Sequence, residues 1–337
     1  MRLIGAAFAA LMAWQGQWSP VAVIDGDAVM RGLAPDAIPS IDAPVFVEGA
    51  TTRELRDDEL VIGVTNGRTT KAYSAWHLNS HEIVNDLLDG QPIAVTWCPL
   101  CFTGIVYSRM IEGRPLQFGV SGLLWRENLV MYDRDTGSWW SQATGRSIRG
   151  PLEGRALTMI PAAMMSWGEW RRLHPDTLVL SKSDSRSPVD RRDVYAPYHD
   201  SAQLGVTGRM RSLKGPDPKL RVAGFRHNGD AFAIDLSKLR TGTVALAFAT
   251  TTAIVIAGQA RDSARVFLAG NHAFSVRRRG EQTEVLDQAT GSHWSAEGLA
   301  VDGVLQGQRL AEVPVTTAYW FAWRAFFPAT TWVEFKE

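Results

Sequence analysis

Both cysteines of the 337-residue chain lie in one apolar segment, Ala94-Val95-Thr96-Trp97-Cys98-Pro99-Leu100-Cys101-Phe102-Thr103-Gly104. The segment His81-Glu82-Ile83-Val84-Asn85-Asp86 precedes it and brings a histidine and three further polar side chains. Paired thiols with a histidine nearby form the densest group of reactive side chains in the sequence. A Cys-x-x-Cys pair of this kind carries out thiol redox chemistry or binds a metal ion.

In the redox interpretation, one thiolate attacks a substrate and the second thiol resolves the mixed disulfide. The attacking thiol then needs a lowered pKa, which a protonated histidine or a helix N-terminus can supply. His81 would tune the thiolate, and Glu82 or Asn85 would orient the histidine. The predicted catalytic residues are therefore Cys98, Cys101, His81, Glu82 and Asn85, with an unknown small molecule or protein thiol as the partner.

Three other interpretations stay open. Cys98, Cys101 and His81 could hold copper or zinc, because thiolate and imidazole ligands suit both ions. The protein could instead be a non-catalytic module that binds a ligand in a Trp-rich cleft, with the two cysteines as a structural disulfide. Finally, buried free cysteines can simply act as small hydrophobic side chains.

The local sequence predicts which elements position these groups. Asn79 suits a helix N-cap, Glu82 the capping-box position and Gly90 the C′ position, so we expect a helix over residues 79–88 with His81 in its first turn. Alternating or continuous apolar runs predict strands at 60–64, 70–74, 92–97, 105–109, 116–120, 129–133, 139–142 and 177–181, and helical spacing predicts a helix at 164–173. The pair 66–67, Asn-Gly, predicts a hairpin turn between the first two strands.

Composition limits the class of protein. The apolar fraction of 45% and the charged fraction of 21% are ordinary for a folded chain. Thirty-five basic residues balance thirty-five acidic ones, which argues against a nucleic-acid partner. Residues 1–20 begin with one arginine and an apolar run that is too short to span a bilayer, so they predict a leader segment and export to the periplasm or cell envelope, with a cytoplasmic location as the alternative.

The two halves of the chain share a pattern of residues that suggests an internal repeat. Six residues of the first half have an identical counterpart 153 residues later: Gly154 and Gly307, Leu157 and Leu310, Pro161 and Pro314, Trp167 and Trp320, Trp170 and Trp323, and Pro175 and Pro328. We therefore predict a mainly β, α+β protein of two pseudo-repeated lobes, each closed by a helix and a strand. Expected divisions are an extended arm at 21–59, a first lobe at 60–181, a linker or excursion at 182–219 and a second lobe at 220–337. Aligning 245–248 with 94–97 places Ala249 and Thr252 at the cysteine positions, so the second lobe would lack the thiols.

Several of these motifs occur together, in the same order, in a known family. They are His81-Glu82-Ile83-Val84-Asn85-Asp86, Val95-Thr96-Trp97-Cys98-Pro99-Leu100-Cys101, Phe118-Gly119-Val120-Ser121-Gly122, Leu129-Val130-Met131-Tyr132-Asp133-Arg134, Trp140-Ser141-Gln142 and His174-Pro175-Asp176-Thr177-Leu178-Val179-Leu180-Ser181. From about Ile38 to its end, the chain resembles the prokaryotic domain of unknown function 3179 family. That family has no established reaction, but some relatives are described as selenoproteins, which implies reactive chemistry at this pair of positions. Phe102 and Trp97 depart from the small residue and the tyrosine that are common in the family.

Overall fold

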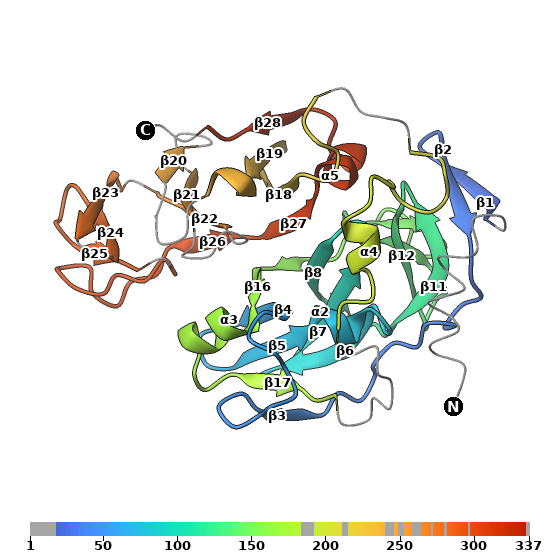
Figure 1. The fold of residues 1–337 in the computed structure, drawn as a ribbon, viewed down its shortest axis with the longest axis horizontal. Coiled ribbons are helices and arrows are strands. Elements are labelled where there is room, and N and C mark those ends of the chain that lie inside the picture. Colours follow the sequence, from blue (N-terminus) through green and yellow to red (C-terminus); the bar gives the residue numbers. More distant parts are fainter. Residues whose placement is uncertain are drawn as a thin grey trace.

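The computed structural model describes residues 18–182, 192–210, 215–239, 246–248, 253–257, 264–270, 272–279, 282–295 and 297–334. It is built mainly of β-strands in several sheets, as predicted, with a few short helices (Figure 1). No helix in these ranges is both long and apolar enough to cross a membrane. The predicted leader lies almost entirely outside the described residues.

One sheet of the first lobe has five strands in the order β16-β4-β5-β17-β3. Its strands are β3 (Phe46–Glu48), β4 (Leu60–Thr65), β5 (Thr70–Ser74), β16 (Ala162–Ser166) and β17 (Leu178–Leu180). The hairpin of β4 and β5 closes at Asn66 and Gly67, as the sequence predicts. Helix α3 (Trp167–Leu173) packs on this sheet, and Gly63 is required there because a β-carbon would collide with the Trp170 ring. The predicted helix at 164–173 was therefore too long by three residues, since Met164 to Ser166 complete β16.

A second sheet carries the cysteine segment and has the order β15-β8-β7-β6. Its strands are β6 (Ile83–Leu88), β7 (Gln91–Cys98), β8 (Thr103–Ser108) and β15 (Met159–Ile160). The helix predicted at 79–88 is wrong, because β6 occupies most of that range. Asp89 and Gly90 have φ values of 52° and 83° and form the tight turn into β7, so Gly90 closes a hairpin rather than a helix. The helix that does form is α2 (Ala75–Leu78), capped by the Ser74 hydroxyl.

The third sheet of this lobe has the order β1-β2-β11-β12-β13-β14. Its strands are β1 (Ser19–Ile24), β2 (Asp27–Arg31), β11 (Phe118–Trp125), β12 (Asn128–Asp133), β13 (Trp139–Ser141) and β14 (Ser147–Arg149), with the small hairpin β9 (Met110–Ile111) and β10 (Arg114–Pro115) nearby in sequence. The N-terminal arm thus starts as a hairpin that extends this sheet beside β11. Beyond it, Ile41 bridges Val84 and ties the arm to β6.

The described residues of the second lobe form three sheets. They comprise β18 (Arg221–His227), β19 (Asp230–Asp235), β27 (Val315–Tyr319) and β28 (Thr330–Trp332); β20 (Leu246–Phe248), β21 (Ala253–Ala257), β22 (Ala264–Leu268) and β26 (Ala311–Val313); and β23 (Phe274–Arg279), β24 (Gln282–Asp287) and β25 (His293–Trp294). The 3-10 helix η2 (Leu236–Lys238) follows β19, and helix α5 (Trp320–Phe326) follows β27.

The sheets of the two lobes follow similar orders. The order β27-β18-β19-β28 parallels β16-β4-β5-β17, and β28 pairs in parallel with β19 just as β17 pairs in parallel with β5. Likewise, β26-β22-β21-β20 parallels β15-β8-β7-β6. The internal duplication remains a prediction, but these orders correct its alignment, because 246–248 form β20, in the place of β6, whereas β21 stands in the place of β7. Ala249 and Thr252 lie outside the described residues, so their comparison with the cysteines is not supported.

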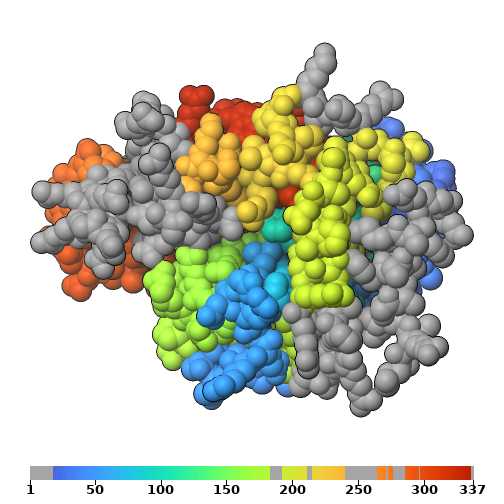
Figure 2. Space-filling view, in the orientation of Figure 1, coloured from blue at the N-terminus to red at the C-terminus, as the bar shows by residue number. Residues whose placement is uncertain are grey.

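Between the lobes, residues 192–210 form an excursion that packs on the first lobe, and we call it the cover segment. It contains the short helix α4 (Ala196–His199), and its Tyr195 and Tyr198 side chains are both buried. The Tyr198 hydroxyl of α4 reaches the Leu100 carbonyl just before β8, α4 overlaps the first lobe in the view of Figure 1, and Figure 2 shows the segment, in yellow-green, running across the face of the molecule. This part of the predicted linker is therefore a packed element rather than a free tether.

Candidate functional site

The two cysteines close the hairpin between β7 and β8. Cys98 is the last residue of β7 and pairs with Thr103, the first residue of β8, so Cys101 lies in the tight turn between them. The Cys101 N–H donates to the Cys98 carbonyl over 3.2 Å. Both residues are buried and carry free thiols. The hairpin therefore brings the thiols together inside the core, as the spacing predicts.

The surroundings make the two thiols unequal. Burial by itself would raise the pKa of Cys98, but hydrogen bonds from the Cys101 thiol and from the main-chain N–H groups of Leu129, Cys101 and Leu100 outweigh it and lower that pKa. Burial raises the pKa of Cys101 well above its ordinary value, and its hydrogen bond to Cys98 and the charge of that thiolate add to the effect. Of the two thiols, Cys98 is therefore the one that more readily forms a thiolate, whereas the surroundings of Cys101 favour its protonated form.

Glu82 faces this site from the turn before β6. Its carboxyl is buried, and burial together with the Cys98 charge raises its pKa well above the ordinary value, which favours the protonated acid. Its carbonyl accepts the Trp97 N–H over 2.8 Å, which ties the turn to β7. The sequence predicted that Glu82 would cap a helix, and this is wrong because β6 forms there, with the Glu82 carboxyl near Cys98. Its role in orienting His81 stays a prediction.

His81 and Asn85 are held by other contacts. Nδ1 of His81 lies 2.8 Å from the Pro39 carbonyl oxygen, and its ring packs against His77 at 4.8 Å. The Asn85 amide donates to the Phe118 carbonyl and accepts from the Phe118 N–H, so it joins β6 to β11. The hydrogen bonds that lower the Cys98 pKa come from Cys101 and the main chain.

The cover segment and the second lobe enclose the thiol turn. The Tyr198 hydroxyl donates to the Leu100 carbonyl over 2.8 Å. The Glu127 carboxylate accepts from the Val206 and Thr207 N–H groups at 2.8 Å and 3.1 Å. The Glu127 carbonyl oxygen lies 3.2 Å from Cys101 Sγ and is an alternative acceptor, beside Cys98, for the one hydrogen of that thiol. This enclosure is not evident from the spacing of the cysteines, although the segment Val194-Tyr195-Ala196-Pro197-Tyr198-His199 has the apolar and aromatic content of a buried element.

The sequence of the chain matches one known protein family. A family model described as "Protein of unknown function (DUF3179)" matches residues 35–330, which is most of the chain. The chain belongs to the DUF3179 family. No curated protein and no solved structure matches it.

Next to the thiol turn, this DUF3179 protein buries a polar network that no local sequence motif indicates. The Gln142 side chain accepts from Thr103 Oγ1 at 3.2 Å and from the Asn128 amide at 2.9 Å, and it donates to Thr96 Oγ1 at 3.1 Å. The Asn128 side chain also hydrogen-bonds Cys101. Because each lost partner would leave a buried polar group, the network fixes β12 and β13 against the thiol hairpin.

Three residues around the DUF3179 site have left-handed backbone conformations that are unfavourable for side chains of their type. Their φ values are 57° at Glu82, 54° at Phe102 and 65° at Glu127. Such conformations cost on the order of 1–3 kcal/mol each and persist where the surrounding packing imposes them. Each of these residues shapes the surroundings of the thiols. Glu82 contributes its carboxyl, Glu127 contributes its carbonyl, and Phe102 completes the turn that holds Cys101.

A copper or zinc ion at this DUF3179 site would need three or four suitable ligands. Within the described ranges, no group of three or more His, Cys, Asp or Glu side chains is arranged to hold a metal ion. Two thiols alone do not complete the three or four ligands of a zinc site. The residues predicted as ligands, Cys98, Cys101 and His81, do not form such a group among the described residues, and copper or zinc binding stays a prediction.

Proposed function

We propose that the protein is a thiol/disulfide redox protein in which Cys98 attacks and Cys101 resolves. The observation that carries the proposal is the difference between the surroundings of the two thiols. Hydrogen-bond donors surround the Cys98 sulfur and lower its pKa, whereas the Cys101 sulfur lies 3.2 Å from the Glu127 carbonyl and its protonated form is favoured. Attack on a disulfide requires a thiolate, and resolution requires a second thiol within reach, so the arrangement suits both steps.

The proposed reaction with a small disulfide R–S–S–R transfers two electrons from the dithiol. The Cys98 thiolate attacks one sulfur, the mixed disulfide Cys98–S–S–R forms, and RS⁻ leaves and takes the Glu82 proton. The ionised Glu82 then accepts the Cys101 proton, and the Cys101 sulfur attacks Cys98 and releases a second RS⁻. The products are the Cys98–Cys101 disulfide, RSH and RS⁻, and Glu82 ends protonated as it began.

Burial of both sulfurs limits which partners can react. Cys98 is 2% exposed and Cys101 is fully buried, so a protein disulfide could reach them only if the cover segment moves. A small thiol or disulfide needs a smaller opening. We therefore favour a small-molecule partner, and we place the activity in the cell envelope, where disulfide chemistry is sustained.

A redox titration against dithiothreitol mixtures of graded potential tests the function. The chain has two cysteines, so the loss of about two mass units on oxidation reports this pair alone. In matched variants, Cys101→Ser should trap a mixed disulfide at Cys98, whereas Cys98→Ser should trap little. A folded protein whose pair never oxidises reversibly, or whose two variants react equally, would rule the proposal out.

Elemental analysis of protein purified without chelators separates the alternative of copper or zinc binding. Under the redox proposal, wild type and Cys98→Ala carry the same substoichiometric metal content. Stoichiometric metal in the wild type that disappears in Cys98→Ala would instead establish a metal centre.

A further inference from the structure

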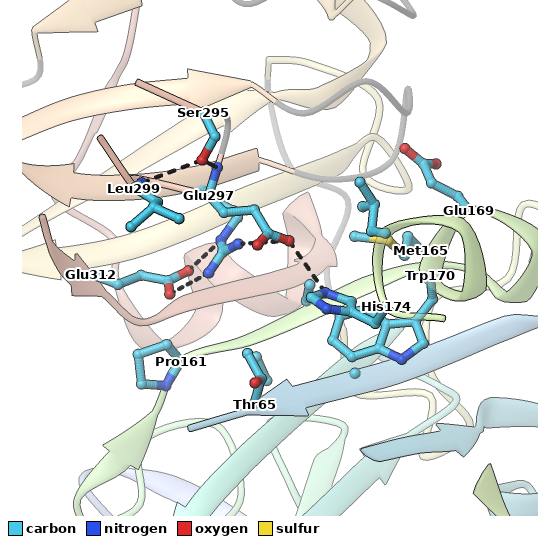
Figure 3. A pocket seen from close by; sticks show the side chains of 15 residues that line it. Thr65, Pro161, Met165, Glu169, Trp170, His174, Ser295, Glu297, Leu299 and Glu312 are labelled. Carbon is cyan, nitrogen blue, oxygen red and sulfur yellow. Dashed lines mark hydrogen bonds and ion pairs between the residues drawn. The ribbon is translucent and has the colours of Figure 1, made fainter. Parts of the chain in front are cut away.

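A cavity of about 360 Å³ lies between the two lobes, outside the thiol site. The first lobe contributes residues of β4, β16 and α3, and the second lobe contributes β22, β26 and the loop after β25 (Figure 3). Its volume falls within the range of roughly 300–1,000 Å³ typical of small-molecule sites. A cavity of this size, shared by two lobes, calls for an occupant with definite chemistry.

One side of the cavity is apolar and rigid. Met165, Trp170 and Leu173 come from the first lobe, and Leu299 faces them from the second. The indole N–H of Trp170 donates to Thr177 Oγ1 over 3.0 Å, and its ring packs on His174 at 4.1 Å. The indole is therefore fixed before any ligand arrives, so a hydrophobic body could bind there at little cost in side-chain ordering.

The other side carries an excess of negative charge. The Arg265 guanidinium forms a bidentate ion pair with Glu312, in which Nε and Nη2 lie 2.7 Å and 2.6 Å from the two carboxylate oxygens. Glu297 lies 3.8 Å from Arg265 and 3.3 Å from Nε2 of His174. Burial lowers the pKa of His174, which favours the neutral ring at pH 7. One guanidinium therefore serves two carboxylates.

The negative charge of Glu297 is the less well neutralised of the two, because Arg265 pairs mainly with Glu312. Its Oε1 atom, the oxygen that lies near Arg265 and His174, is buried and makes no well-aligned hydrogen bond with the residues that the structure describes. The side chain as a whole keeps 33% of its surface accessible, so a ligand can still reach the carboxylate. A buried carboxylate oxygen that lacks a well-aligned donor is costly, and a ligand that supplies the donor recovers that cost.

We propose that this cavity binds a small organic cation, with its ammonium group on Glu297 and its apolar body between Met165, Trp170 and Leu299. An anionic ligand is disfavoured because Arg265, the one guanidinium among the described lining residues, is already paired with Glu312. The proposal is independent of the thiol chemistry, since none of the lining residues belongs to the Cys98 site.

Calorimetric titration with three probes of similar shape tests the charge: benzylamine, benzyl alcohol and benzoate. We expect saturable binding of benzylamine, weaker binding of the alcohol and none of benzoate. Glu297→Gln should weaken benzylamine roughly 10- to 100-fold, the range expected for losing a hydrogen bond to a charged group. Glu112→Gln, at an exposed glutamate of the first lobe, is the matched control and should change nothing.

A second variant, Leu299→Trp, fills the cavity and should abolish benzylamine binding without removing a charge, so the site is tested even if Glu297→Gln folds poorly. The proposal is overturned if benzoate binds as tightly as benzylamine, if benzylamine shows no saturable binding at millimolar concentration, or if Leu299→Trp leaves its affinity unchanged.

Discussion

The main-chain N–H of Tyr319 donates to the carbonyl oxygen of Cys101 over 2.9 Å. Tyr319 ends β27 of the second lobe, whereas Cys101 lies in the turn of the first, so one hydrogen bond joins the two lobes at the thiols. The Phe102 ring, 5.4 Å from the Tyr319 ring, reinforces the contact. Any separation of the lobes at this point would disturb the turn that holds Cys101 against Cys98.

The thiolate of Cys98 should form at lower pH than an ordinary cysteine thiolate, because its pKa is lowered by hydrogen bonds from Cys101 and the main chain. Removing one donor in Cys101→Ala should move the transition to higher pH. Absorbance near 240 nm reports thiolate directly and does not require a reagent to enter the core. An unchanged midpoint in Cys101→Ala would contradict the proposed role of the Cys101 thiol.

Tyr198→Phe should loosen the cover segment. The hydroxyl donates to the Leu100 carbonyl and accepts the Gly205 N–H, and both groups lose their partner in the variant. We expect a loss of about 1–3 kcal/mol in the free energy of unfolding and faster reaction of Cys98 with a small thiol reagent. Denaturant titration and thiol labelling measure the two effects. Tyr132→Phe, on the far more exposed Tyr132, is the control and should leave the labelling rate unchanged.

Acidification should destabilise the protein partly through His199. Burial, with the charges of Lys219 and Arg221, lowers its pKa to about 4 although Asp200 opposes the shift, and Asp193 and the Tyr319 hydroxyl also face the ring. Because the unfolded histidine takes up a proton near pH 6.5, this stability is complete above that pH and disappears as the pH falls through 4.

The difference should amount to about 2–3 kcal/mol between pH 7 and pH 4. His199→Asn keeps a group able to bond the Tyr319 hydroxyl but cannot titrate, so its unfolding free energy should fall less over the same range. Parallel slopes for wild type and variant in urea titrations at each pH would exclude a contribution from His199.

Lys71→Met should be among the most destabilising single changes in the first lobe. Nζ of Lys71 lies 2.8 Å from Asp86 Oδ2, and both side chains are buried. Removing one partner leaves an unpaired buried charge, which costs about 3–5 kcal/mol in the free energy of unfolding. Adding Asp86→Leu should recover much of the loss. Arg68→Ala, which breaks an exposed pair with Asp89, should cost less than about 1 kcal/mol.

The strands were predictable where β-branched runs ended at a clear turn. Strands β4, β7 and β12 lie where the sequence placed them, since each has a continuous apolar run with Gly, Asn or Asp at its ends. Strand β6 was not predicted, because Ile83, Val84 and Leu88 satisfy helical and extended spacing equally. Asp89-Gly90 was the deciding signal, and its preference for a tight hairpin turn outweighs the resemblance of Asn79 and Glu82 to a capping box.

The cysteine pair could be predicted from its spacing, whereas its surroundings could not. The groups that enclose it come from distant parts of the chain, with 98 residues between Leu100 and Tyr198 in sequence. No local pattern reports such contacts. The backbone conformation of Glu82 could not be predicted for the same reason. Glutamate does not favour a left-handed conformation, so the packing around the turn imposes it.

The late position of the cover segment also affects how the protein is made. At synthesis rates of roughly 5–20 residues per second, the chain that covers Leu100 follows the cysteines out of the ribosome by on the order of ten seconds, and Tyr319 follows later still. During that interval the thiols belong to an incomplete first lobe and are open to every oxidant in their surroundings. Whether the newborn pair is enclosed as dithiol or disulfide is therefore decided by the compartment in which synthesis or export ends, before the mature protein exists.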